Sequence, residues 1–294
     1  MPGLYAGHYI FSIKCINLPV FKSKTMKLPE REYLIISANS TAYCLLSYLI
    51  IFLIFQVVTA VTSGLFNIPV TLYYNHVGFN CKSDIWTTDS VKVVFGSGNA
   101  ILIILAITFL VIYIKAIEFN GLLRMFFLWG FIHATSMVIG SAVVGAFIFE
   151  GFGFVLTYLY ISETIKMVIL FIGIFIMLII GLAMLKPFLF SSNIYYNYLS
   201  PEMRPIFRFH QFVVPYIVST LIIIVFKFPL SLYEMLLLLL PVFMLIPLFL
   251  SINRFPKFYF EKTRKTFYYD KRLIYITIVV FVIYRVVLGI GIDF

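Results

Sequence analysis

The chain has 294 residues, of which 62% are hydrophobic and only 12% are charged, and its mean hydropathy is +1.05. A soluble domain is about 45–50% apolar and about 25% charged, so this composition excludes an ordinary water-soluble protein. The formal net charge of +10 would suggest nucleic-acid binding in a soluble protein, but here the basic residues lie in short runs between apolar segments. We therefore predict an integral membrane protein that contacts the lipid bilayer and binds no nucleic acid.

Residues 1–41 are predicted to form a cytoplasmic or interfacial segment before the first membrane span. The stretch Gly3–Phe21 is apolar, but Lys14 and Pro19 interrupt it and no basic region precedes it. A secretory signal peptide is therefore not indicated, and Met26 is an alternative start of the chain. The three cysteines are too widely separated to predict a disulfide framework or a zinc site.

The rest of the chain, residues 42–294, is predicted to be one all-α transmembrane bundle of about seven helices. A helix needs about 20 mainly apolar residues to cross the hydrocarbon core, and seven segments come close to that length. They are Ala42–Phe66, Val94–Ile117, Phe126–Phe149, Ile165–Leu185, Phe212–Phe226, Met235–Leu250 and Leu273–Gly291. The apolar runs are continuous rather than alternating, which excludes spanning β-strands. Pro229 and Ser231 separate the short fifth and sixth segments and predict a tight helical hairpin there.

The basic residues predict the orientation of these helices. With the N-terminus inside, 17 Lys and Arg residues fall on the inner side and only four on the outer side, as the positive-inside rule requires. The C-terminus is then outside. The basic loop at 253–272 is predicted to contact anionic lipids of the cytoplasmic leaflet, or simply to fix the topology. Short inner loops and the lack of a signal peptide favour the cell membrane of a bacterium.

The third predicted span carries the most polar groups. Trp129, His133, Ser136, Gly140 and Ser141 follow one another at helical spacings, so they lie near one face. One hypothesis makes His133 a buried ligand, proton carrier or catalytic base, with Trp129 and Ser136 beside it. The alternative is that a neutral His133 bonds a neighbouring helix while the small residues pack closely. The zinc motif HExxH is absent, and no metal site is predicted.

The segment Phe95–Asn99 opens the second predicted span with the sequence Phe-Gly-Ser-Gly-Asn. Two glycines and an asparagine could form a broken helix whose free backbone groups bind an ion, which makes Asn99 a second candidate for a polar cavity. The alternative is a loop-to-helix junction in which Ser97 or Asn99 caps the helix.

Arg285 lies within the otherwise apolar last span, where a cation must reach the headgroups or find a carboxylate. Three glutamates are predicted near the same outer face, namely Glu150, Glu163 and Glu234. We predict that Arg285 forms a structural ion pair with one of them and fixes the last helix to the bundle. The alternative is that it reaches the outer headgroups alone.

The sequence contains no GxxxxGK[ST] motif and no Ser/His/Asp constellation, and we predict no catalytic residues and no cofactor. Three hypotheses for the function remain. The first is a transporter or permease of a small solute or lipid through helices kinked by proline, although the near absence of carboxylates within the spans weighs against proton coupling. The second is a membrane-embedded scaffold or accessory subunit with a membrane-protein partner. The third is an intramembrane enzyme centred on His133.

Overall fold

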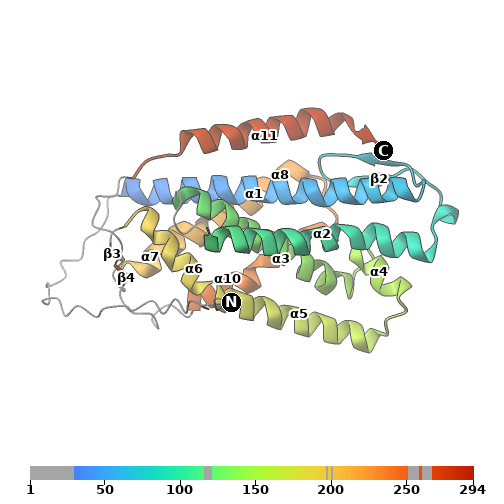
Figure 1. Cartoon of the computed structure of the whole chain (residues 1–294), viewed down its shortest axis with the longest axis horizontal. Coiled ribbons are helices and arrows are strands. Elements are labelled where there is room, and N and C mark those ends of the chain that lie inside the picture. Colours follow the sequence, from blue (N-terminus) through green and yellow to red (C-terminus); the bar gives the residue numbers. More distant parts are fainter. Residues whose placement is uncertain (1–29, 116–120, 197, 200, 251–257, 260–266) are drawn as a thin grey trace, which may run out of the picture.

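The computed structural model of the chain describes residues 30–115, 121–196, 198–199, 201–250, 258–259 and 267–294. Seven helical segments in it are long and apolar enough to cross a membrane, which confirms the predicted number of spans by length and composition. They run back and forth along the bundle in chain order (Figure 1). The segments are Arg31–Leu65, Thr88–Lys115, Leu123–Gly145, Glu163–Ile194, Arg204–Lys227, Leu232–Leu250 and Lys271–Ile290. The side of the membrane on which each end lies, and the identity of the membrane, remain predictions.

The first helix starts much earlier than the hydropathy of the sequence predicts. Helix α1 covers Glu30–Leu65, a length of 36 residues, whereas the prediction began at Ala42. Polar residues between Ser37 and Thr41 lower the local hydropathy, but no proline or glycine interrupts the helix there. Their side chains are used inside the fold. Ser40, for example, is only 1% exposed and donates a hydrogen bond to the backbone carbonyl of Gln211 at 2.7 Å.

Helices α2 (Thr88–Lys115), α3 (Gly121–Gly145) and α11 (Lys271–Ile290) are each continuous. The other three spans are divided into shorter elements. The fourth comprises α5 (Glu163–Ala183), α6 (Leu185–Phe190) and the 3-10 helix η3 (Ser191–Ile194). The fifth comprises α7 (Arg204–Arg208), the π-helical turn η4 (Phe209–Val213) and α8 (Val214–Lys227). The sixth comprises α9 (Leu232–Leu239) and α10 (Pro241–Leu250).

Prolines mark these divisions, as expected from the missing backbone donor. Pro215 follows the π-helical turn at the start of α8, and Pro241 begins α10 where α9 has ended. Pro247 lies inside α10. The fifth and sixth spans form the predicted hairpin, because the side chain of Lys227 at the end of α8 bonds Glu234 near the start of α9.

Short strands lie at both ends of the bundle. At one end, β1 (Val70–Leu72) pairs with β2 (Val77–Phe79) and with β5 (Ile292–Asp293), both antiparallel. We call this the hairpin end; it also carries the short helices η1 (Ser83–Ile85) and α4 (Phe152–Tyr158). At the other end, β3 (Tyr198–Leu199) pairs with β4 (Phe258–Tyr259). We call this the basic end. Most of the basic loop 253–272, like residues 1–29, lies outside the described residues.

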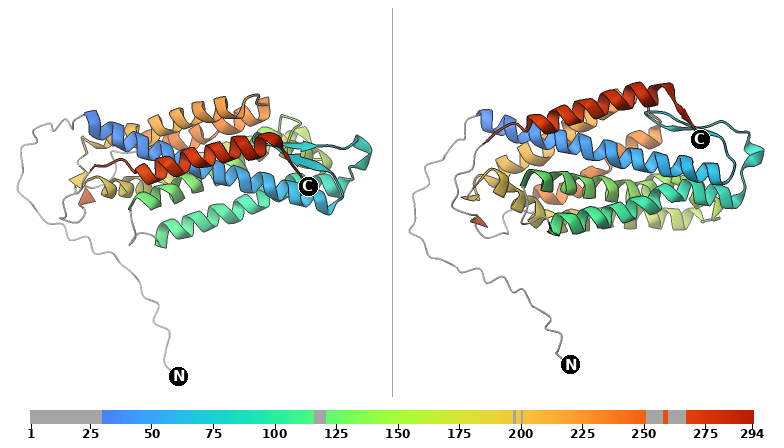
Figure 2. Two further views of the ribbon diagram at one scale, coloured as in Figure 1. Left: turned by 90° about the horizontal axis from the view of Figure 1, so that it is seen from above. Right: turned by 45° about the horizontal axis from the view of Figure 1, so that its top comes forward.

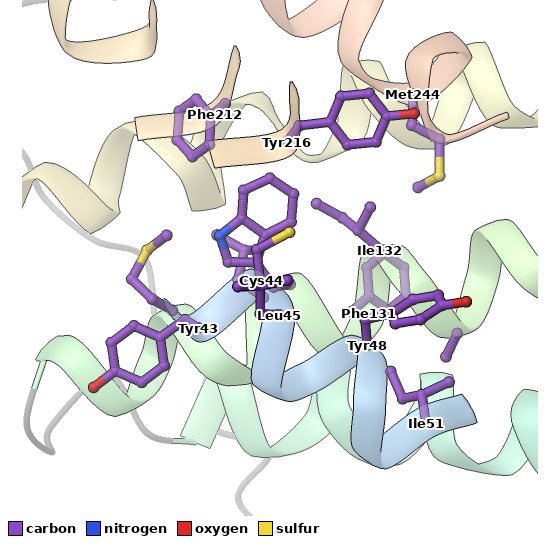
Figure 3. Close-up of a cluster of buried hydrophobic side chains, with 14 of the residues drawn as sticks. Tyr43, Cys44, Leu45, Tyr48, Ile51, Phe131, Ile132, Phe212, Tyr216 and Met244 are labelled. Carbon is purple, nitrogen blue, oxygen red and sulfur yellow. The ribbon is translucent and has the colours of Figure 1, made fainter. Parts of the chain in front are cut away.

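Helices α1 and α3 form the centre of the bundle, and α5 and α11 lie on opposite sides of it (Figures 1 and 2). In the most apolar window of α3, 78% of the residues are buried, against 22% in α11. The outer faces of α5 and α11 expose large side chains such as Phe171, Phe175 and Ile283. Such an apolar exterior is the surface that a bilayer covers. Figure 3 shows the central cluster, in which Cys44 and Tyr48 of α1 face Tyr216 of α8.

Candidate functional site: a cavity at the hairpin end

A cavity of about 520 Å³ opens among the helices at the hairpin end. This volume lies within the range of ordinary small-molecule sites, about 300–1,000 Å³. Most of its wall is apolar, and eight aromatic side chains line it: Tyr48, Phe52, Phe55, Phe79, Phe95, Phe152, Phe154 and Tyr233. His76 and Pro229 at its rim are exposed, so the cavity opens toward the hairpin end. Met137 and Leu238 line its deeper part together with Tyr48.

The cavity wall contains a buried ion pair. The ammonium of Lys227 lies 2.8 Å from the carboxylate of Glu234, and the two side chains are 3% and 21% exposed. The same ammonium lies 3.8 Å from the ring centroid of Phe52, a cation–π contact. Local sequence explains the geometry. Ser231 and Glu234 form a capping box at the start of α9, which places the carboxylate beside the last residue of α8.

Polar groups on three helices also reach the cavity. Ser141 of α3 donates to Asn99 Oδ1 of α2 at 2.9 Å, and both residues line the wall. Gln56 of α1 is 2% exposed and donates through Nε2 to the backbone carbonyl of Tyr73 at 3.4 Å. Its Oε1 atom has no hydrogen-bond partner among the described residues. A buried acceptor without a donor is costly, so Gln56 is an unusual component of this wall.

The segment Phe95–Asn99 does not have either of the predicted conformations. Helix α2 begins seven residues earlier, at Thr88, and continues through both glycines. Thr87 caps it instead, because its hydroxyl accepts from the backbone of Ser90 at 3.1 Å while the Ser90 hydroxyl accepts from the backbone of Thr87 at 2.9 Å. Gly98 packs closely against Phe55, because a Cβ atom there would force the Phe55 ring to shift.

The loop between β1 and β2 holds the rim of the cavity. Asn75 donates weakly to the backbone carbonyls of Lys227 and Pro229, at 3.5 and 3.4 Å. Tyr74 donates to the carbonyl of Phe228 at 3.2 Å. This loop therefore fastens the turn between α8 and α9. Glu150, which precedes α4, lines the cavity on another side.

Arg285 lies away from the cavity wall. Its guanidinium lies over the ring of Tyr74, 4.1 Å from the centroid. Of the three predicted partners, Glu234 bonds Lys227 and Glu163 bonds Lys166 at 2.7 Å. Within the described ranges, no carboxylate lies within 4 Å of Arg285. The search for a partner of Arg285 in the sequence considered only carboxylates, so the aromatic ring of Tyr74 was not predicted.

His133 lies below the cavity, within the bundle. It is 6% exposed, and its Nε2 atom lies 3.3 Å from Cys44 Sγ. The His133 ring stacks on Trp129 and meets Tyr48 edge-on. A void of about 10 Å³ adjoins His133 and Ser136, which is room for about one water molecule and not for a substrate.

Trp129 completes the buried face of α3. It is 0% exposed and donates through Nε1 to Ser40 Oγ at 3.0 Å. The small residues of α3 pack as the sequence suggests, because a Cβ atom at Gly140 would lie 2.8 Å from Leu240. The structure thus brings together three of the nominated residues, Asn99, Glu150 and Glu234, in the cavity, and places His133, Trp129 and Ser136 below it.

Gln56, Lys227 and the aromatic wall were not predicted as site residues. Lys227 is one of the four basic residues predicted on the outer side. The sequence does hold a signal for its partner, because the capping box that begins at Ser231 includes Glu234, seven residues after Lys227. The aromatic residues come from five separate segments, so no local pattern could group them.

The described segments therefore form a helical bundle with seven candidate membrane spans, which is the arrangement of a multi-pass membrane protein. This bundle has a cavity at one end. Comparisons with protein-family models, with curated proteins and with solved structures find no match to this chain.

Proposed function

We propose that the protein is a transporter or permease that takes a small, largely apolar solute into the hairpin-end cavity. The observation that carries this proposal is the cavity itself, which has the size of a ligand site and opens at one end of the bundle, while Tyr48 and Met137 separate it from a void of only about 10 Å³ deeper in the bundle. A site open to one side and closed to the other is what one state of an alternating-access protein requires.

A line of polar side chains on α1 leads from the cavity toward the basic end. Gln56, Tyr48, Cys44, Ser40 and Ser37 follow one another at spacings of three, four and eight residues, so they form a slanted stripe on the helix. All five are buried. At the far end of this line, Ser37 lies 3.1 Å from the Nδ1 atom of His210. A polar stripe of this kind offers partners to a solute once the floor opens.

The fifth span, which packs on α1, and the sixth span, which packs on α3, contain the breaks that such an opening needs. The π-helical turn Phe209–Val213 and Pro215 interrupt the fifth span, and Leu240–Pro241 interrupts the sixth. Tyr216, just after the first break, bonds the carbonyl of Leu238 just before the second, at 2.8 Å. The two breaks are therefore coupled, and a hinge at these positions would move the floor of the cavity.

The test uses single cysteines in a background without Cys15, Cys44 and Cys81. Proteoliposomes carry either Ser141→Cys in the cavity or Ser40→Cys near the basic end, and a membrane-impermeant methanethiosulfonate is added from one side at a time. Lys82→Cys and Arg272→Cys, both exposed and at opposite ends, report the orientation of the protein. We expect Ser141→Cys to react from the hairpin end and Ser40→Cys to react, more slowly, from the basic end.

Two outcomes would contradict the proposal. If Ser40→Cys never reacts from the basic end while Ser141→Cys reacts from the hairpin end, the protein binds a solute without passing it on. If neither reacts, the bundle is dry, and the scaffold hypothesis replaces transport. A buried serine outside the cavity, Ser63, provides the control variant Ser63→Cys, which should stay unreactive from both sides.

A further inference from the structure

The charge of the cavity wall is not balanced. Two carboxylates, Glu150 and Glu234, line it together with one ammonium, that of Lys227. Glu234 already bonds Lys227, so the charge of that pair is internally compensated. Among the described residues, no Lys, Arg or His lies within 4 Å of the Glu150 carboxylate. With His76 at the rim counted as uncharged, the cavity therefore holds one negative charge in excess, at Glu150.

The aromatic wall suits a cation as well as an apolar body. The negative faces of aromatic rings attract ammonium groups within about 6 Å of the ring centroid. Phe52 already uses its ring in this way toward Lys227. The remaining rings of the wall come from α1, β2, α2, α4 and α9, and so surround the space from several directions. A ligand with an aromatic or aliphatic body would bury it against these rings, which gives most of the binding free energy.

From the excess charge and the aromatic wall we propose that the cavity binds an amphipathic organic ammonium, with its apolar body against the aromatic wall and its charge balanced by Glu150. This inference rests on the proposed function, because it names the class of solute that the transporter takes. An organic anion is disfavoured by the excess carboxylate, since Lys227 is held by Glu234 and Phe52.

The test compares three probes that share one apolar body and differ in charge: 4-phenylbutylammonium, 4-phenylbutanol and 4-phenylbutyrate. Each is used to slow the labelling of Ser141→Cys from the hairpin end, with the same thiol reagent throughout. We expect the ammonium to protect at a concentration about tenfold below that of the alcohol, and the carboxylate to protect least. The N-trimethylated ammonium keeps the positive charge and should also protect better than the alcohol.

One substitution locates the effect. Glu150→Gln should remove most of the preference for the ammonium over the alcohol. Glu163→Gln is the matched control, because this carboxylate is 85% exposed, bonds Lys166 and lies outside the cavity. It should leave this preference unchanged. The comparison of the three probes on Ser141→Cys alone stands even if a variant fails to fold.

The outcomes separate this inference from the proposed function. If Ser141→Cys reacts but all three probes protect it equally, or the carboxylate protects best, the cavity is real and the cation inference is wrong. If the preference for the ammonium survives Glu150→Gln unchanged, Glu150 is not its counter-ion and the assignment is also wrong. If Ser141→Cys does not react from the hairpin end at all, the proposed function itself fails.

Discussion

Lys227 and Glu234 form an ion pair of 2.8 Å across the turn that joins α8 to α9. Each charge also suits the helix end on which it lies. Lys227 is the last residue of α8, where the helix dipole favours a cation, and Glu234 is in the first turn of α9, where it favours an anion. The pair therefore closes the hairpin of the fifth and sixth spans and forms part of the cavity wall.

We predict that removal of one partner of this pair is more harmful than removal of both. Lys227→Met leaves the Glu234 carboxylate without its cation, and the loss of one partner of a buried pair costs about 3 kcal/mol or more. The double variant Lys227→Met/Glu234→Gln leaves no buried charge and retains a side-chain acceptor for the capping box. Thermal unfolding in detergent should show a lower Tm for Lys227→Met than for the double variant. A double variant with a Tm equal to or below that of Lys227→Met would contradict the pairing.

The contact between α5 and α10 depends on a glycine. A Cβ atom at Gly181 would lie 2.2 Å from the backbone carbonyl oxygen of Met244, and a backbone atom cannot move aside as a side chain can. Gly181→Ala should therefore lower the stability by about 1–3 kcal/mol. Gly96→Ala is the control, because nothing lies within 4 Å of a Cβ atom at that helical position. It should be neutral or slightly stabilising. Equal Tm values for the two variants would show that α5 and α10 are not packed as described.

The contact of Arg285 can be measured with double-mutant cycles. If the guanidinium interacts with the ring of Tyr74, the pair Arg285→Met and Tyr74→Leu should show a coupling of about 0.5–1 kcal/mol. The pair Arg285→Met and Glu234→Gln should show none, because Glu234 is held by Lys227. A larger coupling to Glu234, or rescue of Arg285→Glu by a lysine at position 150, 163 or 234, would favour the ion pair that the sequence suggests.

His133 is expected to act in packing rather than in solute binding. Its ring contacts Trp129, Tyr48 and the thiol of Cys44, but it does not line the cavity. His133→Ala should therefore lower the free energy of unfolding by about 3 kcal/mol, the loss typical of a truncated buried ring, and the Tm should fall. Protection of Ser141→Cys by 4-phenylbutylammonium should not change. A loss of protection in a variant that still unfolds cooperatively would place His133 in the binding site after all.

The positions of the spans could be predicted well from the sequence because the length of an apolar run is set by the thickness of the bilayer. The start of α1 could not. Hydropathy treats Asn39 as a residue for water, but this side chain is 1% exposed and bonds the backbone of Tyr268 and Asp270. A polar residue that finds its partner more than 200 positions away gives no local signal.

The candidate site shows the same limit. Asn99, Glu150 and Glu234 could be nominated because polar residues stand out in apolar segments, although Asn99 was nominated for a break in the helix that is not there. The cavity that brings them together depends on where α1, α2, α3 and α9 diverge, which is decided by packing across the whole chain. The aromatic wall remained hidden because single phenylalanines are common in every span of this sequence.

We propose that water and solutes enter the bundle at the hairpin end, and the labelling rate of Ser141→Cys measures this entry. In proteoliposomes, an impermeant thiol reagent on the side where Lys82→Cys reacts should label Ser141→Cys at least about tenfold faster than Ser63→Cys, since both serines are buried but only Ser141 lines the cavity. Equal and negligible rates for the two positions would show that the cavity is closed to water, and transport through it would be excluded.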